Sequence, residues 1–297
     1  MTLVHGEGRP AATVLITTRN RRDDLRRAIA SAVRQSERIE VLVIDDGSTD
    51  GTAEMVRAEF PGVRLLRHED SRGYIVRRNE GARLAAGPIV FSIDDDAEFA
   101  SAETVRQTLK EFASERIGAV AIPHINVNVG PEVHHRAPDA GSVYVTGHYI
   151  GTAHAIRRDV FERLGGYREL THQGEELDLC IRMIEDGYLV RLGSADPIHH
   201  FESPNRDRRR MDYYGVRNAI RFVWQNVPQP FAIVHLLIVA ARCMALTLAP
   251  RRLAVRASGL LAGLADCAPS MRRPVSRQTY HLWRQLERAP RRLDQLT

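Results

Sequence analysis

Short apolar runs alternate with segments of helical periodicity along the first part of the chain. Residues 13–18, 41–45 and 89–94 are rich in β-branched and aliphatic side chains, which is typical of buried strands. Helical segments lie between them, and the one at about 73–86 ends at a Gly-Pro pair that favours termination. This alternation predicts an α/β fold, with a mostly parallel sheet flanked by helices and joined by right-handed crossovers.

The last part of the chain has a different pattern, because its periodicity is helical and amphipathic and prolines interrupt it repeatedly. We therefore expect a sheet domain over residues 1–225 and a helical C-terminal region over 226–297. Residues 231–249 are nearly all apolar, but Arg242 and His235 oppose insertion into a bilayer. Contact with a membrane surface, packing within the protein or against a homodimer partner, and a true span all remain open for this segment.

Composition and charge narrow the class of protein. Hydrophobic residues make up 43% and charged residues 27% of the 297 residues, as in folded soluble proteins. The net charge of +5 favours anionic partners such as nucleoside diphosphates, nucleic acid or an acidic membrane surface. The basic residues are spread along the chain without an aromatic stacking platform, so we do not expect a nucleic-acid-binding protein.

Cysteine usage and the N-terminal segment bear on the compartment. Cys180, Cys243 and Cys267 stand far apart, without the spacing of a disulfide framework or a zinc site. The N-terminal segment lacks the basic start and long apolar core of a secretory signal. We therefore expect a cytoplasmic protein, and peripheral contact with the cytoplasmic face of the membrane stays open.

Acidic side chains follow two of the predicted strands. Asp45 and Asp46 come at the end of the second strand, and Asp94, Asp95 and Asp96 at the end of the third. Ligand crevices of such sheets lie beyond the carboxyl ends of the strands, so we expect both groups to border one crevice. Adjacent carboxylates repel one another unless a cation neutralises them. Asp94 and Asp96 offer the oxygen ligands that Mg²⁺ or Mn²⁺ prefers, although a solvated acidic turn fits the spacing equally well.

Several segments match, in order, the motifs of a known family. They are ITTRNR (16–21), VIDDGSTDGT (43–52), NEGAR (79–83), FSIDDDAEF (91–99), LGGYRE (164–169) and GEELDLCIR (174–182). Each motif is weak by itself, whereas the ordered set is specific. Over roughly residues 10–225 the chain resembles family 2 glycosyltransferases with the GT-A fold. The resemblance implies inverting transfer of a sugar from a nucleoside-diphosphate donor, with Mg²⁺ or Mn²⁺ as cofactor, in the synthesis of a polysaccharide, glycolipid or glycoconjugate.

The resemblance also assigns residues to the donor. Asp94 and Asp96 resemble the DxD motif that holds the metal ion with the donor diphosphate. Arg78 fits a phosphate contact, and a surface arginine is an equally good interpretation. UDP, GDP and dTDP sugars are all open as donors. The residues implied to contact the donor nucleotide are Thr17, Thr18, Arg19, Asp45, Asp46, Arg78, Asp94 and Asp95.

Two neighbouring glutamates are candidates for the base of the reaction. Inversion requires a group that takes the proton of the acceptor hydroxyl while the diphosphate leaves. Glu175 and Glu176 stand where the family commonly has an acid followed by aspartate. We favour Glu176 as the base, with Glu175 directed toward the acceptor or the donor. An acidic helix N-terminus without a catalytic role is the physical alternative.

Histidines and a glycine loop complete the predicted site. The resemblance implies that a histidine at position 199 or 200 joins the metal ligands. Because neighbours in a strand face opposite ways, only one of His199 and His200 should reach the ion. The acceptor is expected to be a saccharide, a lipid-linked molecule or a small molecule. By analogy, the acceptor side is formed by Gly165, Gly166, Tyr167 and His148.

Two other functions fit parts of the same pattern. A sugar-phosphate nucleotidyltransferase also combines a nucleotide-binding α/β sheet with acidic metal ligands, but the sequence lacks the glycine-rich pyrophosphate-binding start expected there. A catalytically silent scaffold protein that keeps the fold is the second alternative, and the intact acidic set counts against it. The basic run at 206–210 fits either a phosphate clamp or a solvated basic face.

Overall fold

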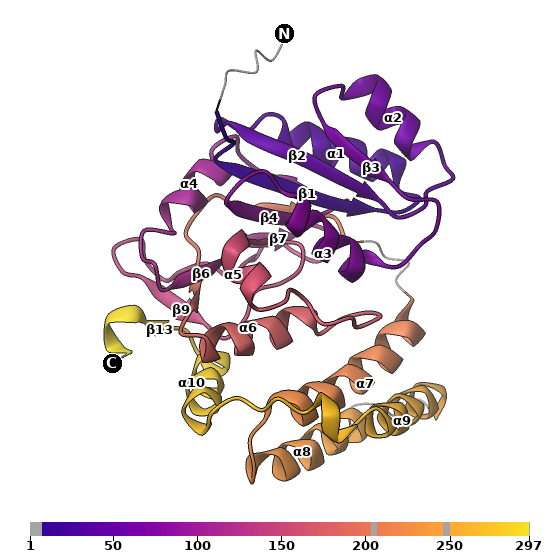
Figure 1. The fold of residues 1–297 in the computed structure, drawn as a ribbon, viewed down its shortest axis with the longest axis vertical. Helices are drawn as coiled ribbons and strands as arrows, with labels where there is room; N and C mark the ends of the chain where they lie inside the picture. Colours follow the sequence, from indigo (N-terminus) through magenta and orange to yellow (C-terminus); the bar gives the residue numbers. More distant parts are fainter. Residues whose placement is uncertain (1–7, 203–206, 246–249, 297) are drawn as a thin grey trace.

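The computed structural model describes residues 8–202, 207–245 and 250–296, without the side chains of 243–245. Within these residues the chain forms a nine-stranded sheet, a smaller four-stranded sheet, and helices on both faces of the larger one (Figure 1). The predicted α/β fold with a helical C-terminal appendage is confirmed in outline. The carboxyl ends of the first strands of the large sheet border the candidate site.

The elements follow the predicted alternation. The large sheet comprises β1 (Ala12–Thr18), β2 (Ile39–Asp45), β3 (Arg64–Arg67), β4 (Ile89–Asp94), β6 (Ile117–Ala121), β9 (Tyr144–Thr146), β10 (His154–Arg157), β11 (Leu189–Leu192) and β13 (Arg291–Arg292). The small sheet comprises β5 (Ala97–Phe99), β7 (His124–Asn126), β8 (Val133–His134) and β12 (Ile198–His200). The α-helices are α1 (Arg22–Ala32), α2 (Thr52–Glu59), α3 (Tyr74–Leu84), α4 (Thr104–Lys110), α5 (Arg158–Arg163), α6 (Glu175–Glu185), α7 (Arg208–Asn226), α8 (Phe231–Ala245), α9 (Pro250–Ala265) and α10 (Arg277–Arg288). Two 3-10 turns follow them, η1 (Pro269–Met271) and η2 (Leu293–Gln295).

The parallel half of the large sheet brings the acidic strand ends into register. In the order β3-β2-β1-β4, every neighbouring pair is parallel. Thr18 at the end of β1 is paired with Asp45 of β2, and Thr17 is paired with Asp94 of β4. The expected convergence of the acidic groups at one edge of the sheet is therefore seen in the structure.

The other half of the large sheet is mixed, which differs from the mostly parallel sheet that the alternation predicts. β10 lies antiparallel between β4 and β6, and β9 lies antiparallel to β11. These strands come after residue 115. In this part of the chain, strands no longer alternate regularly with single helices as they do in the first half. None of these antiparallel pairs is a hairpin, because β10 begins at His154, far after the ends of β4 and β6, and β11 begins at Leu189, far after the end of β9.

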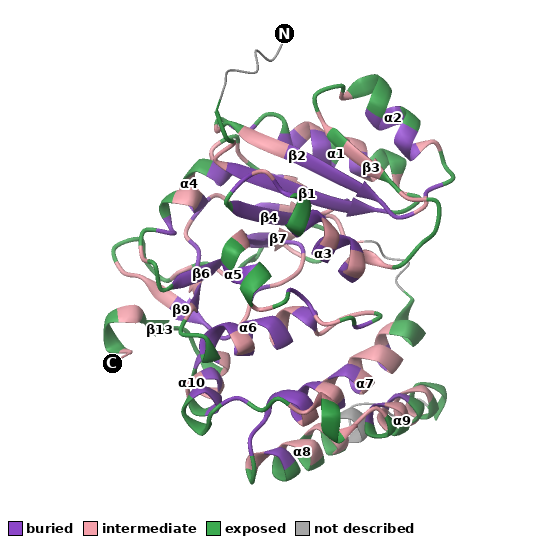
Figure 2. Ribbon diagram, in the orientation of Figure 1, coloured by how far each residue is buried: buried purple, intermediate pink, exposed green. Residues whose placement is uncertain are grey.

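Different helices cover the two faces of the large sheet because successive side chains of a strand point to opposite faces. On β1, Val14 and Ile16 belong to a hydrophobic core that includes Leu25 of α1. Leu15 belongs to a second core that includes Ile75 of α3. Figure 2 shows that the central strands are almost wholly buried between these layers. The sheet is therefore a rigid support for the polar side chains at its edge.

The C-terminal region returns to the sheet. α7, α8 and α9 contact one another and form a helical layer, while α10 packs against α6 (Figure 1). Trp283 and Leu286 of α10 are buried in the same core as the strands, and β13 extends the large sheet beside β9. The boundary between 1–225 and 226–297 stays a prediction, since part of the C-terminal region shares a core with the sheet.

The apolar segment at 231–249 forms α8 over its described part, and residues 246–249 lie outside the described residues. In the part of the chain that the structure describes, no helix combines the length and the apolar character needed to cross a bilayer. Within that same part, Cys180 and Cys267 are both free thiols.

An ion pair joins α10 to the loop before β10, and it should make stability depend on pH. His148 Nδ1 lies 2.7 Å from Glu287 Oε1, and this hydrogen bond raises the pKa of His148 despite its partial burial. A raised folded-state pKa stabilises the fold below the unfolded pKa, and this stabilisation is lost as pH rises through the folded pKa.

We therefore expect Glu287→Gln to lower the free energy of unfolding at about pH 6 by up to about 1 kcal/mol, and by less at about pH 9. Urea unfolding at both pH values measures this difference. Glu115→Gln, at an exposed position on another loop, is the control. An equal loss at both pH values would show that the charge on His148 contributes nothing.

Candidate active site

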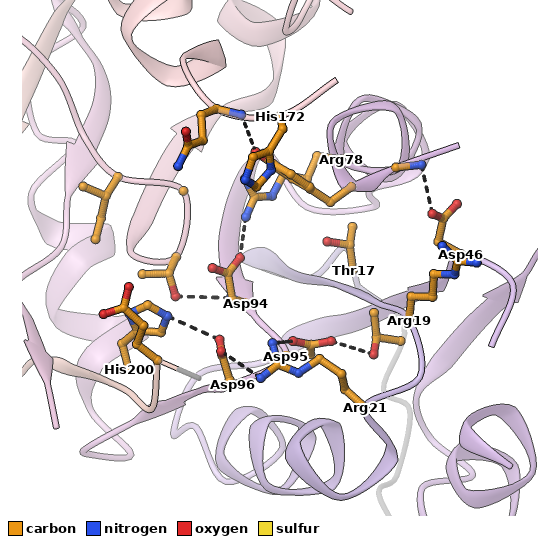
Figure 3. Close-up of a pocket in the computed structure, with 18 of the residues that line it drawn as sticks. Thr17, Arg19, Arg21, Asp46, Arg78, Asp94, Asp95, Asp96, His172 and His200 are labelled. Carbon is orange, nitrogen blue, oxygen red and sulfur yellow. Dashed lines mark hydrogen bonds and ion pairs between the residues drawn. The ribbon is translucent and has the colours of Figure 1, made fainter. Parts of the chain in front are cut away.

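A cleft of about 830 Å³ opens at the carboxyl ends of β1, β2 and β4 (Figure 3). Its walls come from segments far apart in the sequence: the first strands, the start of α3, the segment before α6, the end of β12 and the start of α7. The residues that line it include Thr17, Thr18, Arg19, Arg21, Asp46, Arg78, Asp94, Asp95, Asp96, His172, Glu176, His200 and Arg210.

Three side chains on one wall of the cleft could together hold a metal ion. Asp94, Asp96 and His200 each offer a ligand atom, and these atoms all lie within 4.8 Å of one another. His200 Nε2 lies 3.4 Å from Asp96 Oδ1, and its Nδ1 lies 2.9 Å from Asn126 Oδ1, which orients the ring. Two carboxylates and an imidazole are a suitable donor set for Mn²⁺ and an acceptable one for Mg²⁺.

The strand geometry separates the two candidate histidines. β12 pairs with β5 on one side, so that His200 lies opposite Ala97 next to the acidic turn. His199 faces the other side of the strand, where its ring lies 6.5 Å from that of Phe201. The group of metal-ligand side chains within the described residues therefore includes His200 and not His199.

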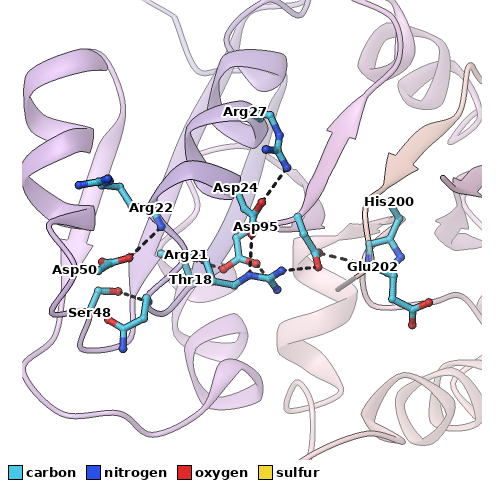
Figure 4. Close-up of polar contacts among 12 residues, drawn as sticks. Thr18, Arg21, Arg22, Asp24, Arg27, Ser48, Asp50, Asp95, His200 and Glu202 are labelled. Carbon is cyan, nitrogen blue, oxygen red and sulfur yellow. Dashed lines mark hydrogen bonds and ion pairs between the residues drawn. The ribbon is translucent and has the colours of Figure 1, made fainter. Parts of the chain in front are cut away.

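Asp95 points away from the other two aspartates into a buried network. Its Oδ2 accepts a hydrogen bond of 2.8 Å from the Thr18 hydroxyl, and its Oδ1 lies 3.3 Å from Arg21 Nη1 (Figure 4). Arg21 Nη2 lies 3.0 Å from Asp96 as well (Figure 3). Burial raises the pKa of Asp95 to about 7, although the charge of Arg21 opposes this rise. Burial acts on Asp96 in the same direction, but its hydrogen bond with His200 and the charge of Arg21 hold the pKa of Asp96 below its usual range.

Arg78 links the metal-ligand side of the cleft to the glutamates of α6. This buried side chain donates a hydrogen bond to Asp94 and another of 3.3 Å to Glu175 Oε1, and its Nη1 lies 3.9 Å from Glu176. Burial lowers the pKa of Arg78, but the charges of Asp94 and Glu175 outweigh it, so the net shift is upward. The guanidinium is therefore a permanent positive charge between two groups of carboxylates.

The two glutamates have different environments at the start of α6. Glu175 is fully buried against Arg78, whereas the side chain of Glu176 is 19% exposed and lines the cleft. Burial and the charge of Glu175 raise the pKa of Glu176 to about 8. The backbone of Gly151 packs against Glu176 and Arg78. A Cβ at this position would lie 2.5 Å from Glu176 Oε1 and 2.7 Å from Arg78 Nη1. Only glycine permits so close an approach.

The paired aspartates after β2 have separate local roles. Asp46 lines the cleft and accepts hydrogen bonds from the Ser71 hydroxyl, the backbone of residues 72–73 and Arg77. It thereby fixes the loop that precedes α3. Asp45 is fully buried beneath it and accepts a hydrogen bond from the Ser48 backbone. The predicted contacts of both with the nucleotide stay predictions.

The side chains expected on the acceptor side lie behind or beside the cleft. Tyr167 is buried, and its hydroxyl lies 3.0 Å from both the Tyr149 hydroxyl and His154 Nε2. Gly165 and Gly166 form a left-handed turn just before it, with φ of +76° and +70°. His148 faces Glu287. An acceptor contact by these residues stays a prediction, and the geometry gives them a supporting position.

The sequence motifs assign no role to Arg21 or Tyr74 of the cleft. Arg21 is one residue of a motif, yet its guanidinium neutralises Asp95 and Asp96. The ring of Tyr74 lies 4.8 Å from the Arg78 guanidinium. Arg210, from the basic run expected to be either a phosphate clamp or a solvated face, reaches the cleft from the start of α7. Of the basic run at 206–210, Arg206 lies outside the described residues. Three acidic residues in succession indicate that a positive charge lies nearby, but the sequence alone does not indicate which arginine supplies it.

Comparison with known proteins decides the family. The model of the family described as glycosyl transferase family 2 matches residues 13–165, just over half of the chain. The chain belongs to glycosyl transferase family 2. The match covers β1 to α5 and thus the acidic strand ends of the cleft.

Individual relatives support this membership over parts of their length. The succinoglycan biosynthesis protein ExoU of Rhizobium meliloti is 37% identical over 89 residues, which cover 29% of this chain and 26% of ExoU. The pre-mycofactocin glycosyltransferase of Mycobacterium tuberculosis is 27% identical over 205 residues, which cover 63% of this chain and 42% of the relative. The chain thus spans less than half the length of these two relatives.

Solved structures show the same fold. The mannosyltransferase PcManGT from Pyrobaculum calidifontis, in complex with GDP-Man and Mn²⁺, superposes with a TM-score of 0.59. The superposition covers 94% of this chain and 80% of PcManGT at 23% sequence identity. The GT-A fold expected from the motifs is therefore confirmed for this family 2 protein.

Proposed function

We propose that this family 2 protein is an inverting glycosyltransferase that uses a nucleoside-diphosphate sugar and a divalent cation. The observation that carries the proposal is the convergence of Asp94, Asp96, His200 and Glu176 on one cleft. These four residues come from β4, the turn after it, β12 and α6. A binding protein would not require a carboxylate with a raised pKa facing its ligand, whereas a transferase does.

In the proposed reaction, Asp94, Asp96 and His200 hold the divalent cation, which when bound neutralises the diphosphate of the donor. Thr17, Thr18 and Arg19 line the part of the cleft next to Asp46 and are positioned for the nucleotide. The Arg78 guanidinium can donate to a phosphate oxygen while it keeps Asp94 oriented. PcManGT, which was solved with GDP-Man and Mn²⁺, supports this assignment by its fold.

Glu176 is the proposed base. Its raised pKa makes its carboxylate a stronger proton acceptor than an ordinary glutamate, and it lines the cleft near Arg78. The acceptor hydroxyl gives its proton to Glu176 while its oxygen attacks the sugar carbon and the bond to the diphosphate breaks. The names of the two relatives, a succinoglycan biosynthesis protein and a pre-mycofactocin glycosyltransferase, support a saccharide or small-molecule acceptor.

A thermal-shift panel tests the proposal. UDP, GDP and dTDP, each with and without Mn²⁺, are added to the protein, and one of them is expected to raise the melting temperature selectively and only with the metal. That nucleotide identifies the nucleoside diphosphate of the donor. The corresponding nucleoside-diphosphate sugars are then tested for metal-dependent hydrolysis or transfer. Stabilisation without turnover would support a silent scaffold. Release of pyrophosphate from a nucleoside triphosphate and a sugar phosphate would support a nucleotidyltransferase.

A further inference from the structure

One side of α8 carries exposed apolar side chains. Ile233 and Val234 are each 58% exposed, Leu237 is 67% exposed and Ile238 is 43% exposed. Their spacing places them on one stripe along the helix. Ala232, on another side of the helix, is fully buried in the hydrophobic core of the sheet. The helix is therefore held against the protein while its apolar stripe is turned to the outside.

α9 has a similar apolar side. Gly259 and Gly263 face α7, since a Cβ on Gly259 would lie 2.4 Å from the carbonyl oxygen of Tyr213. Leu261, midway between the two glycines, points the opposite way and is 68% exposed, and Leu264 is 48% exposed. Because α8 and α9 both pack on α7 and on each other, their exposed sides belong to one helical layer (Figure 2).

Positive charge accompanies these apolar side chains. α8 and α9 together contain four arginines and no acidic residue, and two of the four, Arg252 and Arg256, pair with Asp212 of α7. Arg242 lies on the exposed side of α8, four residues after Ile238, and Arg251 is exposed at the start of α9. Long arginine side chains next to an apolar helix face are favourable where lipid chains meet anionic headgroups.

We propose that the exposed side of α8 and α9 docks the protein on an anionic lipid bilayer. The leucines and isoleucines enter the interfacial region, and Arg242 and Arg251 contact the headgroup phosphates. A second copy of the chain is a poorer occupant, because a two-fold interface would bring the arginines of both copies to the same surface. The surface lies on other elements than the acidic cleft, so lipid binding can be measured without sugar transfer.

Vesicle sedimentation with the full chain tests this proposal. We expect the protein to pellet with phosphatidylcholine vesicles that contain about a quarter phosphatidylglycerol, and to pellet much less with pure phosphatidylcholine. Raised salt should weaken the binding, since the electrostatic part is screened. Equal binding to both kinds of vesicle, or none to either, would overturn the proposal.

Substitutions separate the contributions of apolar and of charged side chains to vesicle binding. Leu237→Glu and Leu261→Glu should each lower vesicle affinity by about tenfold or more. Arg242→Glu should lower it by about fivefold or more, the factor that corresponds to one cationic residue near an anionic surface. Val129→Glu is the matched control for the leucines, because Val129 is 75% exposed on a loop outside the helical layer. Arg83→Glu, at an exposed position of α3, is the matched control for the charge.

Two results would contradict the assignment of this surface. Vesicle affinity that is unchanged in both leucine variants would show that the bilayer contacts another face. A dimer of the wild-type protein in sedimentation equilibrium that Leu237→Glu converts to a monomer would show that a second copy covers the layer. Circular dichroism melts confirm that the variants are folded, as expected for substitutions at exposed positions.

Discussion

Glu176→Gln is expected to lower kcat by about 10²- to 10⁴-fold, the usual contribution of a general base. Glutamine keeps the size of the side chain and the Arg78 contact but cannot accept the proton of the acceptor hydroxyl. Because Glu176 lines the cleft rather than the core, we expect little change in the melting temperature or in donor affinity. Steady-state transfer assays with the identified donor measure the effect.

Glu175→Gln is the matched comparison. Glu175 is fully buried and bonded to Arg78, so its amide variant should alter stability and the orientation of Arg78 more than proton transfer. It also removes the neighbouring charge that raises the pKa of Glu176, and this pKa should fall. A larger loss of kcat in Glu175→Gln than in Glu176→Gln would reverse the two assignments.

The same assignment predicts how the wild-type rate depends on pH. Below its raised pKa Glu176 is protonated and cannot act as the base, so kcat/KM should rise with pH, pass its midpoint near about 8 and level off above that pH. Arg78, Glu175 and His148 are the charged groups that act on it, and a change in any of them shifts the profile. The rise should be absent in Glu176→Gln.

Asp96→Asn is expected to reduce metal-dependent transfer by about a hundredfold or more, since a bound cation contributes several kcal/mol to charge neutralisation. Asparagine retains the size of the side chain while it removes the charged ligand. His200→Ala should also weaken the response to Mn²⁺, because its ring belongs to the same group of ligand atoms. A titration of activity against Mn²⁺ concentration gives the apparent affinity for each variant.

His199→Ala is the control for the histidine, since it stands one residue away on the opposite face of the strand. Its response to Mn²⁺ should equal that of the wild type. If His199→Ala and His200→Ala weakened the response equally, the loss would come from a disturbed β12 and not from a missing ligand.

The sequence predicts the first half of the fold well and the second half less well. Apolar strands and regular helices define the parallel order around β1, and the acidic ends of β2 and β4 converge as expected. The antiparallel position of β10 and the return of β13 to the sheet depend on long-range pairing. Short strands such as β13 carry too little periodicity to reveal such contacts in advance.

In the site, too, features with a local sequence pattern were predictable, whereas contacts between distant residues were not. Strand alternation predicts that only one of His199 and His200 reaches the acidic turn, and the fold decides which one. The network around Arg21 and Arg78 was not predictable, because ion pairs between residues far apart in the sequence leave no local pattern. In a chain rich in arginine, these two residues cannot be distinguished from the solvated ones by sequence alone.

In the proposed function, a cation held by Asp94, Asp96 and His200 lies against the diphosphate of the donor. Phosphorus NMR of a bound nucleoside diphosphate tests it directly, because Mn²⁺ broadens the signals of nearby phosphates. We predict strong broadening of both phosphate signals with the wild-type protein and much weaker broadening with Asp96→Asn at the same nucleotide occupancy and Mn²⁺ concentration. Equal broadening with both proteins would place the metal elsewhere and contradict this account.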